Sequence, residues 1–244
     1  MKPSIITSKH EVNLIVEEAI GIYNDSGMNA FIKFIHAELL KKKVRFPLLE
    51  FAAKIFFVSI PEKKQIEITD KIIALHEIGS NTIAGMILQL RLEKYFSQSI
   101  NKAIEYIIEG NEWYVCDIIG ERVIGFALLT QPEKTIPVLK KLSKHTDKWI
   151  VRSVGVAMHY AVKKGLKKKF VREMFVLLLS LSTVTDFHTK KGVGWAAKTI
   201  AKFYPDIISD FKTEIENEKV RQWFKTKIKI GLGRSNKYAS RYSG

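Results

Sequence analysis

NEWYVCDIIG, residues 111–120, sets a tryptophan and a carboxylate, Trp113 and Asp117, four residues apart at the start of an apolar helical pattern. In a helix, side chains at this spacing lie on one face. Two later stretches repeat the arrangement: DKWIVRS, residues 147–153, and KGVGWAAK, residues 191–198, each place a tryptophan near the start of a predicted helix and a cation three residues later. This recurrence predicts a chain built from repeated helical units.

The rest of the sequence favours the same conclusion. Apolar residues recur with a period of about 3.6 in pieces of roughly 10 to 16 residues, split by turns such as Asn24–Gly27. Ser59 and Glu62 predict a capping box, with Pro61 in the first turn of the helix that follows. The predicted helices cover about residues 12–23, 30–40, 59–75, 82–92, 97–109, 111–129, 132–144, 147–163, 168–182, 187–203 and 206–230.

Helix pairs of roughly 35 to 45 residues match HEAT-like units. Short-linked helix pairs form either a globular all-α bundle or an α-solenoid. We predict an all-α fold, an α-solenoid of HEAT-like repeats in which residues 1–244 form a single domain. The glycine-broken, basic residues 231–244 predict a C-terminal tail. If the recurrent tryptophans share one concave face, that face carries Trp113 with Asp117, Trp149 with Arg152, and Trp195 with Lys198; packing between repeats is the alternative for the tryptophans, above all for Trp149.

The positive charge of the chain is unevenly distributed. The formal net charge is +15, yet residues 1–133 hold 15 Lys/Arg against 17 Asp/Glu. Residues 134–191 hold 14 Lys/Arg against 3 Asp/Glu, and residues 218–244 hold 8 Lys/Arg against 1 Asp/Glu. A basic half joined to a neutral half is typical of proteins that bind a polyanion, most often nucleic acid. A solvated lysine face is the alternative for residues 163–169.

Composition excludes several classes of protein. The single cysteine, Cys116, cannot form an internal disulfide and is expected in the core. The histidines show no ligand spacing, so we expect no metal and no other cofactor. The N-terminus is too polar for a signal peptide, and no apolar run has the length of about 18 residues that spans a bilayer. We expect a cytoplasmic monomer that does not contact membranes.

Familiar nucleotide motifs explain little. GVGWAA, residues 192–197, matches a variant of the dinucleotide fingerprint, but that motif requires a strand before it. Its glycines are better explained by another backbone, of protein or nucleic acid, approaching a helix N-terminus. No Walker A sequence and no zinc-deaminase signature is present.

One carboxylate, one arginine and several aromatic residues beside a basic region suffice for one kind of hydrolysis. Cleaving an ordinary glycosidic bond generally takes two carboxyl groups. A purine alkylated at N3 or N7 is cationic and already a good leaving group, so one carboxylate can stabilise the developing sugar cation and orient water. Tryptophan faces attract such a cation, and arginine binds phosphate through paired hydrogen bonds.

Three segments within residues 100–212 resemble a known family. EWYVCD (112–117), KWIVRS (148–153) and KKGVGWAA (190–197), which runs on to KFYPD (202–206), are similar in order and spacing to the AlkD-type DNA alkylation repair glycosylases with HEAT-like repeats. The resemblance implies an α-solenoid with a basic concave cleft for duplex DNA. It also implies a DNA glycosylase that excises N3- or N7-alkylated purines from that DNA, without a nucleotide cofactor.

The resemblance also assigns roles to residues. It implies that Asp117 is the catalytic carboxylate, that Trp113 and Trp195 form aromatic walls, and that Arg152 holds a flanking phosphate. The residues expected to bind DNA are Arg152, Lys148, Lys190, Lys191, Lys198 and Tyr114. This chain departs from the family pattern at Glu112, where an aromatic residue is common, and residues 1–95 contain no matching motif.

Two other functions fit the same sequence. The first is a non-catalytic HEAT-repeat scaffold that binds bent or branched DNA. The second is a helical-repeat adaptor whose basic face binds an acidic protein. A glycosylase releases bases from DNA, whereas the scaffold does not. The affinity for DNA distinguishes the adaptor from the glycosylase and the scaffold.

Overall fold

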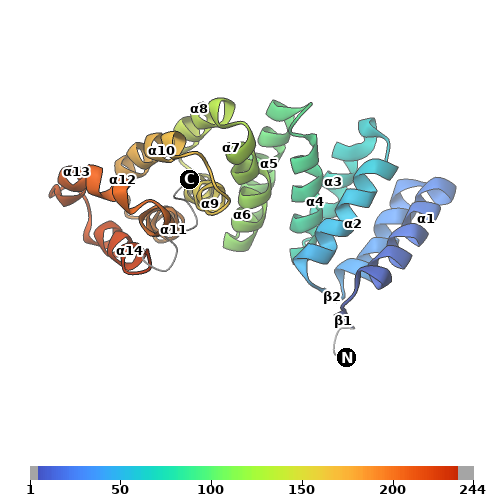
Figure 1. The fold of residues 1–244 in the computed structure, drawn as a ribbon. Coiled ribbons are helices and arrows are strands. Elements are labelled where there is room, and N and C mark those ends of the chain that lie inside the picture. Colours follow the sequence, from blue (N-terminus) through green and yellow to red (C-terminus); the bar gives the residue numbers. More distant parts are fainter. Residues whose placement is uncertain (1–4, 236–244) are drawn as a thin grey trace. The chain divides into compact units, whose positions relative to one another are not determined.

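The computed structural model describes residues 5–235, and helices make up most of that range (Figure 1). The predicted all-α fold of helical repeats is confirmed. In chain order the elements are β1 (Ile5–Ile6), α1 (Lys9–Ile35), the π-helical turn η1 (His36–Leu40), β2 (Lys43–Val44), α2 (Phe46–Ser59), the 3₁₀ turn η2 (Glu62–Lys64), α3 (Gln65–Ile73), α4 (Ile78–Arg91), α5 (Phe96–Gly110), α6 (Trp113–Ile119), the π-helical turn η3 (Gly120–Gly125), α7 (Phe126–Thr130), α8 (Pro132–Leu142), α9 (Lys148–Lys163), α10 (Lys168–Ser180), α11 (Phe187–Phe203), α12 (Pro205–Asp210), α13 (Lys212–Glu216) and α14 (Gln222–Leu232).

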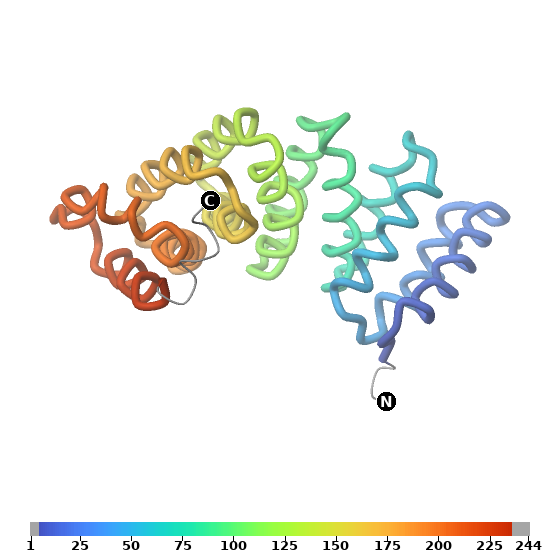
Figure 2. Tube along the Cα trace, viewed as in Figure 1, coloured from blue at the N-terminus to red at the C-terminus, as the bar shows by residue number. Residues whose placement is uncertain are grey.

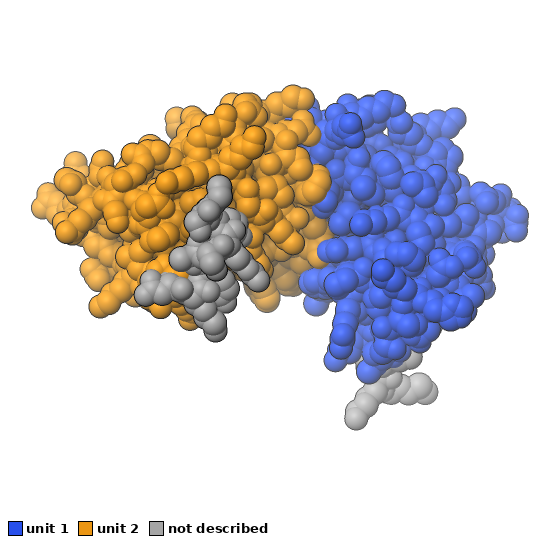
Figure 3. Space-filling view, viewed as in Figure 1, with its two compact units in different colours: residues 1–106 blue, residues 107–244 orange. Residues whose placement is uncertain are grey.

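The chain divides into two compact units, residues 1–106 and residues 107–244 (Figure 3). Figure 2 traces the succession of helices within each of them. Helix α5 contains the boundary between the units. The single HEAT-like domain inferred from the sequence stays a prediction. None of the helices in the described part of the chain is long and apolar enough to cross a membrane.

The start and the break of the first helix, α1, follow from three residues. Ser8 caps α1 by accepting a hydrogen bond from the backbone N–H of Glu11, and the Glu11 carboxylate accepts one from the backbone N–H of Ser8. At Gly27 the backbone has φ 79° and leaves the helical conformation. Glycine adopts this angle without the penalty that a Cβ imposes. The turn predicted at Asn24–Gly27 is therefore present as a break within α1.

The capping box predicted at Ser59 is wrong. Ser59 is the last residue of α2, and the next helical turn begins at Glu62 after Pro61, which has no side-chain cap. Helix α2 was not predicted from the sequence, because its run of apolar residues hides the helical period. One face of α2 is buried in the core of this unit, where the rings of Phe31 and Phe56 meet edge to face at 5.1 Å.

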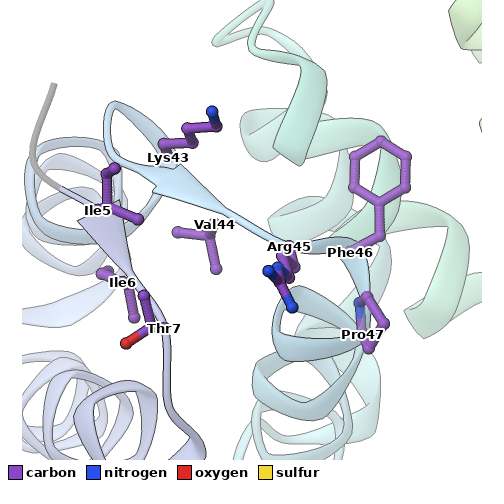
Figure 4. Close-up of a pocket in the computed structure, with 8 residues that line it drawn as sticks. All are labelled: Ile5, Ile6, Thr7, Lys43, Val44, Arg45, Phe46 and Pro47. Carbon is purple, nitrogen blue, oxygen red and sulfur yellow. The ribbon is translucent and has the colours of Figure 1, made fainter.

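A short parallel pairing joins two distant parts of the first unit. Ile5 pairs with Lys43 and Ile6 with Val44. Residues of these strands and of the start of α2 line an apolar pocket of about 670 Å³. Figure 4 shows the side chains that line it. The lining residues are Ile5, Ile6, Thr7, Lys43, Val44, Arg45, Phe46 and Pro47.

In the second unit, α8 and α10 run along one side and α9, α11 and α14 along the other (Figure 1). Glycines bring α9, α11 and α14 close together. A Cβ added to Gly155 on α9 would lie 2.3 Å from the backbone of Gly192 on α11. A Cβ added to Gly231 on α14 would lie 2.4 Å from the carbonyl oxygen of Lys198 on α11. Only glycine allows backbones to approach this closely.

Two expectations about this unit are corrected. The glycines of residues 192–194 lie inside α11 and face other helices of the protein, so no helix N-terminus is involved. Trp195 is accordingly in the middle of α11 and not near its start.

The predicted helical piece 206–230, one of a series of which some were expected to be broken internally, is divided into α12, α13 and α14. Helix α14 continues through Leu232, so residues 231 and 232 do not belong to a tail. Residues 236–244 of the predicted tail lie outside the described residues.

Candidate active site

An ion pair between α6 and α9 forms the centre of the candidate site. Nε of Arg152 donates to Oδ1 of Asp117 at 2.9 Å, and Nη2 donates to Oδ2 at 2.8 Å. The side chains are 17% exposed for Asp117 and 8% for Arg152. Nη1 of Arg152 donates to the carbonyl oxygen of His188 at 3.0 Å. The carboxylate is thus held in one orientation at the edge of the protein interior.

The charge of Arg152 is maintained despite burial. Desolvation opposes its positive charge, but the hydrogen bonds and the negative charge of Asp117 outweigh this effect, so the pKa of Arg152 lies above its usual value. A guanidinium has five N–H groups, and three of them make the bonds described above. The sequence predicted a phosphate as the partner of Arg152. Within the described chain its partner is Asp117, and a phosphate contact stays a prediction that would use the remaining N–H groups.

A second contact fixes the starts of α6 and α9. Trp149 is buried, and its indole Nε1 donates to the side-chain oxygen of Asn111 at 2.7 Å. Asn111 has φ 45°, in the left-handed region, and lies two residues before α6 begins. Asp147 caps α9 by accepting from the backbone N–H groups of Trp149 and Ile150. Trp149 therefore packs between helices, and the alternative in which it lines an exposed face is wrong.

Trp113 has the opposite environment. It is the first residue of α6 and 54% exposed. Its ring meets the half-buried Tyr114 ring edge to face at 5.9 Å. Because Asp117 follows one turn later, Trp113 and Asp117 lie on the same side of α6. An exposed indole beside a fixed carboxylate is the arrangement that the sequence predicted for these two residues.

Trp195 is half-buried and is stacked on a residue that the sequence analysis missed. The ring of His159 lies 3.8 Å from the Trp195 ring at an interplanar angle of 23°, and its Nδ1 is 2.7 Å from the hydroxyl of Thr199. Burial, followed by the charges of Lys163, Lys198 and Lys202, lowers the pKa of His159 to about 3. A neutral imidazole therefore holds Trp195. The only signal in the sequence is that His159 lies seven residues, or about two turns, after Arg152.

Trp195 and Arg152 line a shallow pocket of about 270 Å³ in the second unit. Its other lining residues are Lys191, Gly194, Lys198 and Lys227. Lys191 and Lys198 were predicted to bind DNA, whereas Lys227 was not. Lys148, Lys190 and Tyr114 do not line this pocket; Lys148 instead lies 5.0 Å above the ring of Trp149.

Two neighbours of Asp117 complete the site. The thiol of Cys116 is buried and donates to the carbonyl oxygen of Trp149 at 3.2 Å, which confirms its place in the core. Burial raises the pKa of this thiol. Glu121, four residues after Asp117, is half-buried, and burial raises its pKa. Glu121 lies in the π-helical turn η3 that follows α6, and it was not among the residues predicted from the sequence.

Among the described residues, no group of three or more potential ligands is placed to hold a metal ion. The groups of the candidate site are thus a carboxylate fixed by arginine, an exposed indole, a second indole stacked on imidazole, and several lysines. Together they can orient water, contact a cationic ring and bind phosphate.

Comparison with known proteins agrees with this chemistry. The model of the family described as "DNA alkylation repair enzyme" matches residues 26–226, which is most of the chain. The match includes much of the N-terminal third, where the sequence analysis found no motif. No curated protein and no solved structure matched in the same comparisons. The chain belongs to the DNA alkylation repair enzyme family, which implies a role in DNA repair with DNA as its partner.

Proposed function

We propose that this protein is a DNA glycosylase that hydrolyses the N-glycosidic bond of purines alkylated at N3 or N7 in duplex DNA. The observation that carries the proposal is the paired hydrogen bonding of Asp117 by Arg152 on the side of α6 that also presents the exposed Trp113. A structural ion pair alone does not require an exposed tryptophan one turn away.

Arg152 contributes by positioning. Each carboxylate oxygen of Asp117 accepts one hydrogen bond from Arg152, and each retains a lone pair for another donor. A water bound there is aligned by a carboxylate that cannot rotate. Pre-positioned groups of this kind lower the barrier, since they need no reorganisation during the reaction.

The reaction would proceed as follows. The bond between C1′ of the deoxyribose and the base nitrogen breaks, and its electron pair moves to the base, which leaves as a neutral purine. The Asp117 carboxylate stabilises the positive charge that develops on the sugar. The water oxygen forms the new bond to C1′, and its proton passes to the carboxylate or to solvent. Trp113 attracts the cationic nucleotide before cleavage, an effect worth about 0.5–2 kcal/mol.

The test is release of 7-methylguanine and 3-methyladenine from methylated duplex DNA. Asp117→Asn keeps the shape of the side chain but removes its charge, and we expect release to fall by about 10²-fold or more. Glu112→Gln is the matched control, because Glu112 is exposed on the same helix start and has no side-chain capping bond. Release by Asp117→Asn at the rate of Glu112→Gln would refute the assignment of Asp117.

The second candidate function is a scaffold that binds bent or branched DNA without cutting it. The same ion pair favours it, because two opposite charges that satisfy one another at 8% and 17% exposure can serve stability alone. This function predicts tight, salt-dependent DNA binding with no base release from wild-type protein. Cytoplasmic location and a monomeric state stay predictions.

A further inference from the structure

A cluster of cations lies where α14 packs against α11. Lys198 and Lys227 line the pocket beside Trp195, and Arg234 follows the end of α14. The family match ends at residue 226, so Lys227 and Arg234 lie just beyond it. None of the resemblance-based assignments includes these two residues.

Glycines position this cluster. The backbone of Gly231 rests against the carbonyl oxygen of Lys198, which brings α14 onto α11. The stem of Lys227 then crosses Gly194: a Cβ added there would lie 2.9 Å from Cγ of Lys227. Lys227 and Gly194 both line the pocket that Trp195 lines.

The cations of the cluster act on one another. Burial, followed by the charges of Arg234, Lys227 and Lys202, lowers the pKa of Lys198. Among the described residues that line the pocket, none is a carboxylate. Like charges held together in this way are stabilised when an anion binds between them. The pocket volume of about 270 Å³ is several times the ~30 Å³ share of one water, so a phosphate group fits.

We propose that Lys198 and Lys227, supported by the nearby charge of Arg234, bind a backbone phosphate of the DNA duplex beside Trp195. This inference rests on the proposed function, in which duplex DNA is the substrate. The phosphate contact carries no base specificity, since every nucleotide presents the same group. Its role is to place the duplex so that the sugar adjoining the phosphate meets the aromatic residues of the site.

The test compares charge-neutral variants of the cluster with a matched control. Lys198→Gln, Lys227→Gln and Arg234→Gln each remove one cation. Lys229→Gln removes one from α14 at an exposed position outside the pocket. Binding of an unmethylated, fluorescein-labelled duplex is followed by anisotropy between about 50 and 200 mM NaCl. Unfolding curves of the four variants, followed by tryptophan fluorescence, check that they fold alike.

We expect each cluster variant to bind about three- to tenfold more weakly and to reduce the slope of log K against log [NaCl] by about one. Lys229→Gln should leave both quantities close to wild type. Slopes of the cluster variants equal to that of Lys229→Gln would refute the site. A second result would also refute the site: variants that lose the binding of inorganic phosphate, measured by calorimetry, but bind the duplex as wild type does. The pocket would then bind free phosphate and not the DNA backbone.

Failure of this inference and failure of the proposed function give different results. Reduced slopes in the cluster variants, together with no base release by wild type, would support the phosphate site and reject the glycosylase. Unchanged slopes together with normal base release would reject the phosphate site and leave the glycosylase standing.

Discussion

The two units of this protein use charge in different ways. Residues 1–106 contain 14 Lys/Arg and 12 Asp/Glu, and their cations pair with nearby acids, as Lys94 does with Glu62 at 2.8 Å. Residues 107–244 contain 26 Lys/Arg and 13 Asp/Glu. There, one acid, Asp117, is paired in a buried position, while a group of lysines faces a pocket without carboxylates among its described lining. The first unit balances its charge internally, and the second leaves positive charge for an external anion.

The glycines of the two units meet different surroundings. In the first, the exposed Gly21 on α1 has no atom within 4 Å of the position of a Cβ. In the second, Gly155 and Gly192 bring α9 and α11 together backbone to backbone. Gly192 also lies against the backbone of Arg152, and Nη1 of Arg152 donates to the carbonyl oxygen of His188 near the start of α11. The close contact between α9 and α11 therefore occurs at Arg152, in the unit that carries the candidate site and the excess of positive charge.

The largest expected effect on stability comes from breaking the buried ion pair. Arg152→Met leaves Asp117 with an unpaired, largely buried charge and should lower the free energy of unfolding by about 3–5 kcal/mol. Lys168→Met is the control, since it breaks an exposed pair with Asp206 in the same unit and should cost no more than about 1 kcal/mol. All four tryptophans lie in residues 107–244, so urea unfolding followed by tryptophan fluorescence reports on this unit. Equal losses of unfolding free energy in the two variants would mean that burial does not increase the contribution of the Arg152–Asp117 pair to stability.

The glycines permit a comparison in which one substitution has opposite effects. Gly155→Ala should destabilise the second unit by about 2–3 kcal/mol, because its Cβ would lie 2.3 Å from the backbone of Gly192. Gly21→Ala should stabilise α1 by about 0.5–1 kcal/mol, since alanine loses less backbone entropy in a helix and meets no neighbour here. Urea unfolding measures the first change, and thermal unfolding followed by circular dichroism measures the second. Stabilisation by Gly155→Ala would contradict the close packing of α9 and α11.

The last expected effect depends on pH. The pKa of His159 is lowered to about 3 in the folded protein and is about 6.5 when the chain unfolds. The unfolded state therefore binds more protons between these values, so stability is full above about pH 6.5 and falls as the pH drops below it. From pH 7 to pH 5 His159 should contribute a loss of about 2 kcal/mol. Over the same interval the free energy of unfolding of His159→Gln should fall by about 2 kcal/mol less than that of wild type, as measured by urea unfolding at both pH values. Identical losses would show that His159 is not held neutral.

Much of the fold could be predicted where apolar residues recur with the helical period and polar residues occupy the other face of the helix. Residues 187–203 were predicted as one helix and form α11. Residues 147–163 were predicted as another, and α9 begins one residue later. Helix α2 was missed because its residues are apolar on several sides, and Ser59 was assigned to the wrong helix as a result. Periodicity is informative only when one face of a helix is polar.

The candidate site was predictable in its residue types but not in its contacts. Spacing within a helix placed Trp113 and Asp117 together, since helical geometry is local. It could not reveal that Trp149 is buried against Asn111, or that His159 supports Trp195, because these contacts join residues more than 35 positions apart. The role of Gly192 was likewise hidden, since it depends on which helix lies opposite.

The sequence by itself determined the helical fold class, the concentration of positive charge in the second half of the chain and the set of residues that resembles a DNA repair family. These properties depend on composition and on short-range spacing, which the chain carries whatever its tertiary structure. Only the tertiary structure decided that Arg152 contacts Asp117, that Trp113 is exposed while Trp149 is buried, and that Lys227 joins Lys198 beside Trp195. The physical reason is that burial and charge pairing are set by which helices pack together, and here glycines on α9, α11 and α14 determine that packing.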